Sequence, residues 1–390
     1  MQKKKILLCL EATEGGALKH IIYLATKLDR EKFDITVCLS TLRSPQIFPA
    51  IATLKNLGIA VVEIQMVRNI SPVPDLLAFL KIFFLLGRER FGIVHAHSSK
   101  AGALFRVAAW CFNTPMIVYT PHCFYFQGKK GLKRNLFILL EKVLARTTHA
   151  IIVSKNEEKE AIAAGLCDRR KLYNINNAID VAEYGHVPGK EEIRTRYGIP
   201  VDAIVIGMVG RLEKQKNPAL FVHLAKEIHN RHNNTFFILS GHGRLKDDIH
   251  RLIRSYRMED RIMLTGHIEE IRQIYSVLDI YLSTSLWEGQ PYSILEAAHF
   301  GIPIFTSYDS SFACPIPGNP PRTSHEIQAS SEIRSSREIV ESLCRLIEKK
   351  EFIPAMGHAA KELIKSEYSF PQFLEKHENL YQSQPSVKGL

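Results

Sequence analysis

The chain has 390 residues, of which 46% are hydrophobic and 23% are charged, so global disorder is excluded and two or three domains are expected at roughly 100–200 residues each. Its basic excess lies in the first half: residues 1–190 carry 27 basic and 15 acidic side chains, whereas residues 191–390 carry 24 and 25. The first half therefore favours an anionic partner, for which nucleic acid, a phosphorylated ligand and an acidic membrane surface are all candidates.

Neither targeting nor membrane-spanning segments are expected. The apolar run at residues 6–10 ends at Glu11 and is too short for a signal peptide, so we predict a buried first strand. The most apolar stretch, residues 76–86, contains Lys81 and is far shorter than the roughly 20 residues that span a bilayer. Seven cysteines match neither a disulfide scaffold nor a zinc site, which indicates reduced thiols in a cytosol.

Short apolar runs alternate with longer helical patterns through both halves, which predicts an α/β protein with two doubly wound domains. The boundary is placed at the polar segment 185–190, and residues 315–335 are expected to form a long surface loop. The predicted strands are 5–10, 33–39, 59–64, 93–96, 116–120 and 150–154 in the first half, and 203–209, 235–240, 262–265, 280–283 and 302–306 in the second. The predicted helices are 17–28, 44–57, 74–90, 101–111, 132–146 and 156–164, then 218–230, 245–256, 268–277, 292–300 and 336–350.

Ligands of such sheets bind at the carboxyl ends of the strands, so the loops after the strands are the candidate sites. After the first strand, Gly15 and Gly16 lead into a helix whose free N–H groups favour a phosphate or sugar oxygen, although a local turn explains the same pair. After the fourth strand, Ser98, Ser99 and Lys100 at a helix start predict an anion site. The alternative is that Ser98 caps the helix while Lys100 is solvated.

Residues 127–146 form a basic approach to a strongly apolar helix. Such a segment can lie on an anionic bilayer, with basic side chains at the headgroups, whereas its apolar residues alone are more typical of a domain core. We favour membrane contact because the first-half charge needs a partner. The basic residues concerned are Lys129, Lys130, Lys133 and Arg134.

Two loops of the second half carry the sharper signals. Arg211 and Lys216 follow a strand that ends in glycine and precede a helix, so they can clamp a diphosphate from two sides, although two solvated surface cations remain the alternative. Further on, Glu288 lies in a loop and Glu296 about one turn into the next helix, with the backbone amides of Ser293 and Ile294 expected to be free for an anion. The two carboxylates predict recognition of sugar or ribose hydroxyls. The alternative is that both are exposed glutamates near a helix start, where they stabilise the helix dipole.

The segment Trp-Glu-Gly-Gln-Pro-Tyr-Ser-Ile-Leu-Glu-Ala-Ala-His-Phe-Gly-Ile-Pro at 287–303 resembles the Glu-x7-Glu signature of retaining glycosyltransferases of family 4, which have the two-domain GT-B fold. Other landmarks follow in the order of that family. They are the Gly-Gly loop, Tyr-Thr-Pro-His-Cys-Phe at 119–124, Val-Ser-Lys at 153–155, Asn-Asn-Ala-Ile-Asp at 176–180, Gly-Arg-Leu at 210–212 and Ser-Gly-His-Gly at 240–243. The stretch His-Ala-His-Ser-Ser-Lys-Ala-Gly at 95–102 is similar to bacterial members that extend lipid-linked oligosaccharides.

The resemblance implies a GT-B fold of two Rossmann-like domains facing across a cleft. The acceptor domain would span residues 1–187 together with a returning C-terminal helix at 368–383, and the nucleotide-sugar domain would span residues 191–365. Arg211 and Lys216 would hold the donor diphosphate, Glu296 would bind the ribose, Glu288 would contact the transferred sugar, and His122 would contact the sugar or stabilise charge. For His122, an ordinary half-buried histidine in an aromatic loop is the alternative.

The full donor site implied by the resemblance is Gly15, Gly16, Gly210, Arg211, Lys216, Gly241, Gly243, Glu288, Gly289, Ser293, Ile294, Leu295 and Glu296, with His122, Glu288, Arg211 and Lys216 as the catalytic group. The acceptor site is His97, Ser98, Ser99 and Lys100. No Asp-x-Asp motif is present, so we expect the cations to replace a divalent ion at the diphosphate, with no metal and no cofactor besides the nucleotide-sugar co-substrate.

The resulting hypothesis is a retaining transferase that moves a hexose or N-acetylhexosamine from a nucleotide sugar, expected from the resemblance to be a UDP-sugar, to a polyprenyl-diphosphate-linked glycan. Its product would be a cell-surface polysaccharide such as lipopolysaccharide or capsule. We expect it in the cytoplasm, peripheral on the cytoplasmic face of the inner membrane. Because no nucleic-acid motif accompanies the basic charge, no nucleic-acid partner is expected. The alternatives are a nucleotide-sugar epimerase of the same fold, which needs no acceptor, and a non-catalytic nucleotide-sugar-binding protein.

Overall fold

The computed structural model describes residues 3–45, 47–185, 188–308 and 335–383. Backbone contacts divide the chain into two compact units. The N-terminal unit comprises Met1–Asn177 and Pro371–Leu390, and the C-terminal unit comprises Ala178–Phe370. The last helix of the chain therefore packs with the first unit.

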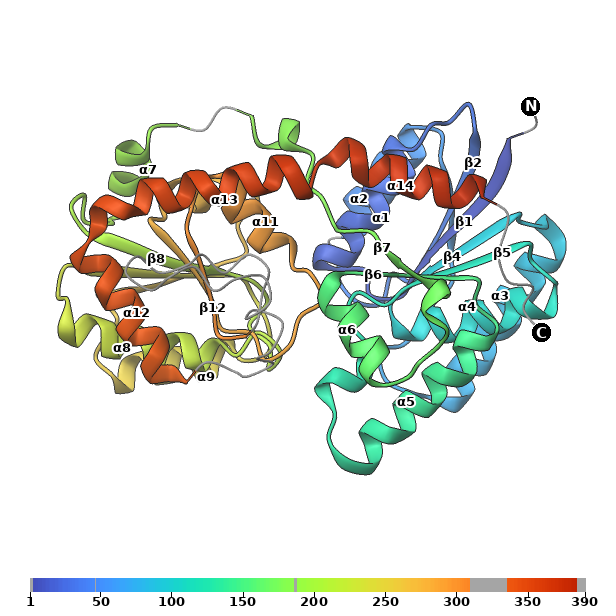
Figure 1. The fold of residues 1–390 in the computed structure, drawn as a ribbon, viewed down its shortest axis with the longest axis horizontal. Helices are drawn as coiled ribbons and strands as arrows, with labels where there is room; N and C mark the ends of the chain where they lie inside the picture. Colours follow the sequence, from blue (N-terminus) through green and yellow to red (C-terminus); the bar gives the residue numbers. More distant parts are fainter. Residues whose placement is uncertain (1–2, 46, 186–187, 309–334, 384–390) are drawn as a thin grey trace. The chain divides into compact units, whose positions relative to one another are not determined.

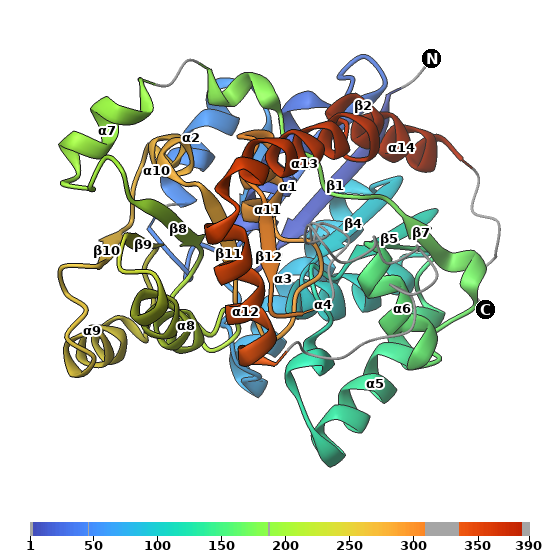
Figure 2. The same cartoon turned by 60° about the vertical axis from the view of Figure 1, so that its left-hand side comes forward.

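The N-terminal unit is built on a seven-stranded sheet in the order β3-β2-β1-β4-β5-β6-β7, with every neighbouring pair parallel. Helices α1, α2 and α14 cover one face of this sheet and α3 to α6 cover the other (Figures 1 and 2). The strands are β1 Lys4–Leu10, β2 Phe33–Leu39, β3 Ala60–Glu63, β4 Ile93–His97, β5 Met116–Thr120, β6 Ala150–Val153 and β7 Leu172–Asn174. The helices are α1 Gly15–Lys27, α2 Ile47–Asn56, α3 Pro72–Glu89, α4 Ser99–Cys111, α5 Gly131–Arg146, α6 Lys155–Ala163 and α14 Phe370–Gln382.

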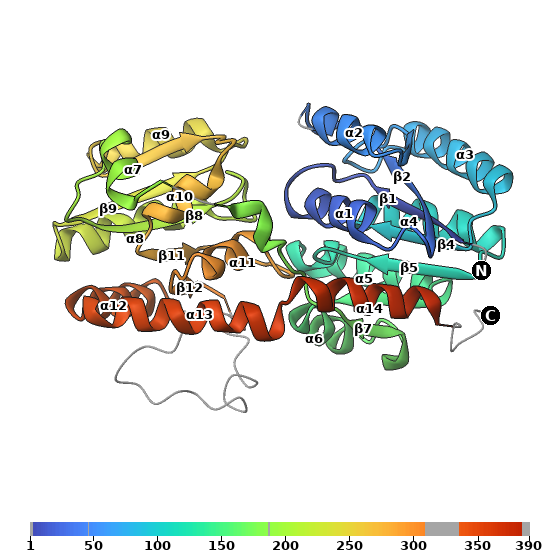
Figure 3. The same cartoon turned by 90° about the horizontal axis from the view of Figure 1, so that it is seen from above.

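The C-terminal unit has a five-stranded parallel sheet in the order β10-β9-β8-β11-β12. Helices α8, α9 and α12 lie on one face, while α7, α10, α11 and α13 lie on the other (Figures 1 and 3). The strands are β8 Ile204–Val209, β9 Thr235–Ser240, β10 Ile262–Gly266, β11 Ile280–Ser283 and β12 Ile304–Thr306. The helices are α7 Lys190–Arg196, α8 Pro218–Arg231, α9 Lys246–Ser255, α10 Ile271–Val277, α11 Tyr292–His299, α12 Ser336–Glu348 and α13 Ile353–Glu367.

Short 3₁₀ turns complete the two units at Tyr125–Gly128, Arg169–Lys171, Val181–Tyr184 and Lys350–Phe352. The hydrophobic cores are formed by strand residues that are buried on both faces, such as Ile6 to Leu10 of β1 and Phe237 to Leu239 of β9. Continuous apolar runs of this kind are expected for parallel strands covered by helices on both sides.

The predicted fold class is confirmed, because each unit is a doubly wound parallel sheet. Each predicted strand is present, with ends that shift by one or two residues. The sequence patterns missed β7, a short edge strand of mixed polarity, and also α7 and α13. The expected surface loop at 315–335 lies outside the described residues except for Ser335, whose side chain caps α12.

In the C-terminal unit, α11 and α13 approach through two glycines. A Cβ atom added at Gly357 would stand 1.8 Å from the carbonyl oxygen of Gly301. No side chain fits at that distance, so the backbones of the loop after α11 and of α13 are in direct contact there.

We predict that Gly357→Ala destabilises the protein by at least about 2 kcal/mol, since one of the two backbones must move to admit the methyl group. Urea unfolding followed by circular dichroism measures the change. Gly189→Ala, where an added Cβ meets nothing within 4 Å, is the matched control and should shift the free energy by less than about 1 kcal/mol. Equal effects of the two substitutions would contradict the close approach.

Candidate functional site

In the C-terminal unit, the loops that follow β8 and β9 meet through their backbones. The Gly210 N–H donates to Ser240 O, and the Leu212 N–H donates to His242 O. Gly241 has a φ of +141°, and a Cβ there would lie 1.9 Å from the Gly210 carbonyl oxygen. A Cβ at Gly243 would likewise lie 2.5 Å from the Leu212 carbonyl oxygen, so the predicted donor glycines Gly241 and Gly243 are needed for a backbone approach that side chains would block. At Gly210, by contrast, an added Cβ would meet only the Lys216 side chain, at 3.4 Å.

The predicted diphosphate cation and the predicted sugar carboxylate are already bonded to each other. Lys216 Nζ donates to Glu288 Oε1 at 2.5 Å, and Ser285 Oγ donates to the same oxygen at 2.7 Å. Both side chains are largely buried. Gln215 also joins the two loops: its side-chain Nε2 donates to Trp287 O, and its backbone carbonyl accepts from the Leu286 N–H. The structure therefore brings together Lys216 and Glu288, which were both predicted in the donor site but not in contact with each other, and Arg211 lies in the same loop as Lys216.

Glu296, the predicted ribose ligand, is held by two tyrosines that sequence reasoning missed. Tyr184 Oη donates to Oε1 at 2.8 Å and Tyr275 Oη to Oε2 at 2.7 Å. Burial, followed by the negative charge of Glu296, raises the pKa of Tyr275 well above its usual value, so this tyrosine remains a donor. The Glu-x7-Glu motif does not predict these partners, because they come from other elements: the 3₁₀ turn at Val181–Tyr184 and helix α10.

One sequence expectation about the start of α11 is wrong. The Ile294 N–H, expected to be free for an anion, donates to Pro291 O at 3.2 Å in the first turn. The side chains of Ile294 and Leu295 are fully buried. Ser293 lies in that same first turn, and Gly289 lies in the preceding loop beside Glu288.

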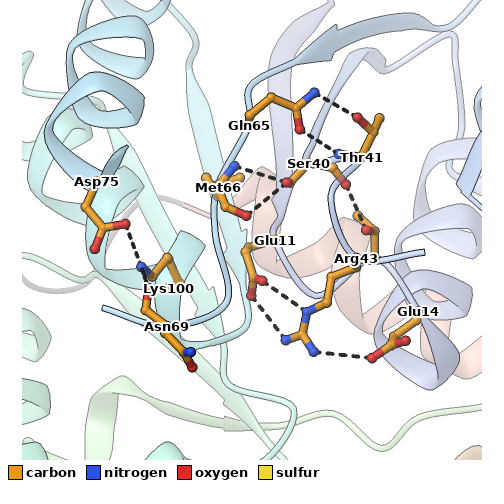
Figure 4. A network of polar contacts seen from close by, with 11 residues as sticks. Glu11, Glu14, Ser40, Thr41, Arg43, Gln65, Met66, Asn69, Asp75 and Lys100 are labelled. Carbon is orange, nitrogen blue, oxygen red and sulfur yellow. Dashed lines mark hydrogen bonds and ion pairs between the residues drawn. The ribbon is translucent and has the colours of Figure 1, made fainter. Parts of the chain in front are cut away.

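In the N-terminal unit, the Gly-Gly loop carries two carboxylates that bind an arginine from the loop after β2, a connection that sequence reasoning did not make (Figure 4). Arg43 donates through Nε to Glu11 at 3.1 Å and through Nη1 to Glu14 at 3.2 Å. Gly15 begins α1 with a φ of +64°, which explains a glycine at this position. Arg43 therefore compensates only one of the two negative charges in this loop, and any phosphate bound at Gly15 and Gly16 would follow these carboxylates directly in the sequence.

Lys100 is not the solvated cation that the alternative interpretation expects. Its Nζ donates to Asp75 Oδ1 at 2.5 Å and to Asn69 O at 2.6 Å, as Figure 4 shows. Ser98 does not cap α4 through its side chain either. Because Asp75 already compensates the lysine charge, the anion site predicted at residues 97–100 has less positive charge than its sequence suggests.

Five histidines gather in the N-terminal unit, where α1, the ends of β4 and β5, and α14 meet. The ring of His122 stacks on that of His97 with centroids 5.2 Å apart and meets His20 edge-on at 4.8 Å. His95 bonds to Tyr381 Oη and Thr120 Oγ1, so the returning helix closes this group. The sequence motifs indicated His97 and His122 as site residues. His20 and His377 lie in helices α1 and α14, where no motif distinguishes them.

Burial lowers the pKa of each of these imidazoles. The pKa of His122 falls to about 3, through burial and then the proximity of His377, and that of His377 falls to about 4. The values for His20, His95 and His97 also lie well below the usual range, again mainly because of burial. His122 is therefore a neutral imidazole at neutral pH and can act through hydrogen bonds rather than through positive charge.

Helices α3 and α5 expose apolar stripes instead of burying them. On α5, the residues at helical spacing 132, 136, 139, 140 and 143 are leucines and a valine, all at least 45% exposed. On α3, the same holds for Val73, Leu76, Leu77 and Phe84, while Ala78, Ile82 and Leu86 form the buried face. Among the described residues no helix combines the length and hydropathy that crossing a bilayer requires.

Comparison with known proteins matches both units to glycosyltransferases. The model of glycosyltransferase family 4 matches residues 14–183, and the model of glycosyl transferases group 1 matches residues 189–317. Two glycosyltransferase models thus match the two halves of the chain, which has the GT-B fold of these enzymes. The solved structure of HepE from Anabaena in complex with UDP and glucose aligns with a TM-score of 0.76 over 97% of this chain and 99% of HepE; at 18% identity this likeness supports the fold alone.

Two curated glycosyltransferases illustrate the range of relatives. The UDP-Gal:α-D-GlcNAc-diphosphoundecaprenol α-1,3-galactosyltransferase of Escherichia coli is 34% identical over 246 residues, which are 62% of this chain and 64% of that enzyme, less than two thirds of its length. The capsular polysaccharide biosynthesis glycosyltransferase CapM of Staphylococcus aureus is 22% identical over 324 residues, which are 82% of this chain and 83% of CapM.

The buried histidines predict acid sensitivity. In the unfolded chain each imidazole binds a proton near pH 6.5, whereas the folded pKa is lower, so stability is complete above about pH 6.5 and falls as the pH drops toward 4. For His377 alone the loss at pH 5 is about 2 kcal/mol. Urea midpoints measured from pH 7 to 5, with EDTA present so that no ion competes with protons, should decline steeply.

The matched comparison is His377→Gln against His223→Gln, because His223 is exposed. The His377→Gln substitution should lower the number of protons taken up on unfolding between pH 7 and 5 by about one. The His223→Gln substitution should leave this number unchanged. Midpoints that do not vary with pH in this window would contradict the neutral, buried state of the group.

Proposed function

We propose that this protein is a retaining glycosyltransferase of family 4 that transfers a hexose or N-acetylhexosamine from a UDP-sugar to a polyprenyl-diphosphate-linked glycan in cell-surface polysaccharide synthesis. The observation that carries the proposal is the bonded pair Lys216–Glu288, which joins the two loops at which the Glu-x7-Glu signature and the Arg-Lys motif converge. The Escherichia coli relative, which by its name uses UDP-Gal and a diphosphoundecaprenol-linked GlcNAc, supports the substrate classes.

The ion pair suggests how donor binding is organised. Lys216 would exchange the Glu288 carboxylate for the donor diphosphate and, with Arg211, would neutralise the charge that grows on the diphosphate as it departs. Glu288, released from the lysine but still accepting from Ser285, would then accept hydrogen bonds from hydroxyls of the transferred sugar. Glu296 is oriented by its two tyrosines and retains lone pairs for the ribose hydroxyls.

For the chemical step, we favour attack from the face on which the diphosphate leaves. The acceptor hydroxyl forms the new bond to the anomeric carbon, the bond to the diphosphate oxygen breaks, and that oxygen takes the acceptor proton. None of the carboxylates discussed above is proposed as a covalent nucleophile. The neutral imidazole of His122 would donate or accept a hydrogen bond at the sugar. Because Arg211 and Lys216 carry the diphosphate charge, we propose no metal ion at that place.

We further propose that the N-terminal unit binds the acceptor and rests on an anionic membrane, on the cytoplasmic face of the inner membrane. The exposed leucines of α5 follow directly on Lys129, Lys130 and Lys133, which combines an apolar stripe with basic side chains. The sequence left open whether the apolar residues of α5 are core, and their exposure favours membrane contact. His97, Ser98, Ser99 and Lys100 remain the proposed acceptor residues.

We predict that Lys216→Ala lowers kcat for sugar transfer by about a hundredfold or more, because it removes a cation from the leaving diphosphate. The assay follows product mass after incubation with UDP-sugars and a short-chain polyprenyl-diphosphate sugar. Lys214→Ala, an exposed lysine two residues away, is the control and should retain activity. An unchanged rate for Lys216→Ala would remove the diphosphate assignment.

The same screen separates the competing functions. Transfer that depends on the lipid-linked acceptor supports the proposal, and epimerised nucleotide sugar formed without any acceptor would indicate the epimerase instead. Binding of a nucleotide sugar with no product of either kind would indicate a non-catalytic protein. Inversion of the anomeric configuration in the product would contradict the retaining mechanism alone.

We predict that vesicles containing anionic phosphatidylglycerol bind the protein at low salt and release most of it at high salt, because charges at the headgroups are screened. The double variant Leu136→Glu with Leu139→Glu should abolish binding, whereas Val201→Glu, at a comparably exposed position in the C-terminal unit, should not. Sedimentation with vesicles measures both. Binding that is absent, or that survives the double variant, would contradict membrane contact through α5.

A further inference from the structure

Buried polar atoms without partners concentrate at one place in the N-terminal unit. Among the described residues, His20 Nε2, His97 Nε2 and Ser98 Oγ are all buried and have no hydrogen-bond partner. His20 and His97 have no exposed surface at all. Buried polar groups are almost always satisfied, so a group of orphans that lie on neighbouring side chains points to a ligand that belongs there.

The geometry of the three nearest rings suits a metal ion. Ring nitrogens of His20, His97 and His122, one from each, all lie within 4.8 Å of one another. The closest pair, His97 Nδ1 and His122 Nε2, forms a hydrogen bond of 3.0 Å, so one of these two nitrogens carries a proton in the absence of an ion. His97 would bind the ion either through this Nδ1, after a change of tautomer, or through its unpartnered Nε2. In a tetrahedral zinc site with bonds of about 2.0–2.1 Å the nitrogens stand about 3.3 Å apart, so closure needs ring movements on the order of 1 Å.

The protonation states suit metal binding as well. His20 Nδ1 lies 3.0 Å from Asn177 Oδ1, an oxygen that can only accept, so the proton of this ring is on Nδ1 and Nε2 carries the lone pair. An imidazole whose second nitrogen is held by an amide or carboxylate oxygen is the usual arrangement around a bound metal. Because burial keeps all three rings neutral, no ring has to lose a proton to solvent; the proton shared by His97 and His122 only has to move to another nitrogen of its own ring.

We infer that His20, His97 and His122 bind a divalent transition-metal ion of the zinc class, with a fourth position left for an oxygen ligand such as water. Three imidazoles with one open position form a known type of zinc site, and imidazole suits zinc, copper and nickel rather than magnesium or calcium. His122 is only partly buried and provides the way in. The site lies wholly within the N-terminal unit and does not involve the cations proposed for the donor diphosphate. It shares His122 with the proposed sugar contact and His97 with the proposed acceptor residues, and a His122 bound through Nε2 would keep Nδ1 for the sugar. Metal retention is measured without sugar transfer, so a failure of this inference is distinguishable from a failure of the proposed function.

The test uses the full-length protein and the metals themselves. After treatment with a chelator and dialysis against Zn²⁺, elemental analysis should find one retained zinc per chain, and Co²⁺ should give the visible absorption of a tetrahedral complex. His20→Ala and His97→Ala should each abolish the cobalt band. His223→Gln, an exposed histidine of the other unit, and His377→Gln, which contacts the group but is outside the ligand set, should both keep it.

A wild-type measurement covers the case in which a variant does not fold. The zinc X-ray absorption spectrum of the unaltered protein should show three imidazole nitrogens at about 2.0–2.1 Å, and saturating Zn²⁺ should raise its unfolding temperature, since the ion binds only the folded state. Absence of retained metal in the wild type would overturn the inference. So would a cobalt band that persists in folded His20→Ala or His97→Ala protein, or a spectrum without histidine ligation.

Discussion

The parallel direction of every strand pair is the constraint on which both candidate sites depend. When all strands of a sheet run the same way, every loop that follows a strand emerges at one edge, and residues far apart in sequence meet there. Lys216 and Glu288 follow β8 and β11, which are direct neighbours in the sheet of the C-terminal unit. His97 and His122 follow the neighbouring strands β4 and β5 of the other sheet and meet in the same way.

The two edges differ in their electrostatics. In the C-terminal unit, a cation is held in a buried ion pair with a carboxylate, so an anionic ligand that took over the cation would leave the carboxylate in need of other donors, of which Ser285 is one. In the N-terminal unit, the corresponding edge contains neutral imidazoles, and the nearby cations Arg43 and Lys100 are compensated by Glu11, Glu14 and Asp75. The first edge therefore holds a charged pair, and the second holds uncharged imidazoles that can donate or accept hydrogen bonds.

Sequence patterns predicted the sheets well because parallel strands covered on both faces are continuous apolar runs, and they predicted Lys216 with Glu288 because both lie in short contiguous motifs. They could not predict Tyr184 and Tyr275 on Glu296, or His20 and His377 beside His122, because these partners come from other elements and share no local pattern with the motif. The free amide expected at Ile294 failed for a related reason: a helix preceded by Pro291 closes its first turn on the proline carbonyl.

The contacts described above show which basic residues of the first half are paired with carboxylates and which are not. Arg106 is buried against Glu141, and Arg43 and Lys100 have carboxylate partners, so these cations do not contribute to an external field. At the start of α5, by contrast, Lys130 and Lys133 stand at the positive end of the helix dipole, with no acidic residue in the first turn. Cations at a helix N-terminus are unfavourable for the isolated helix. An anionic surface that meets the same end of α5 and its exposed leucines would offset this cost, and the uncompensated part of the charge is therefore best explained by a partner outside the chain.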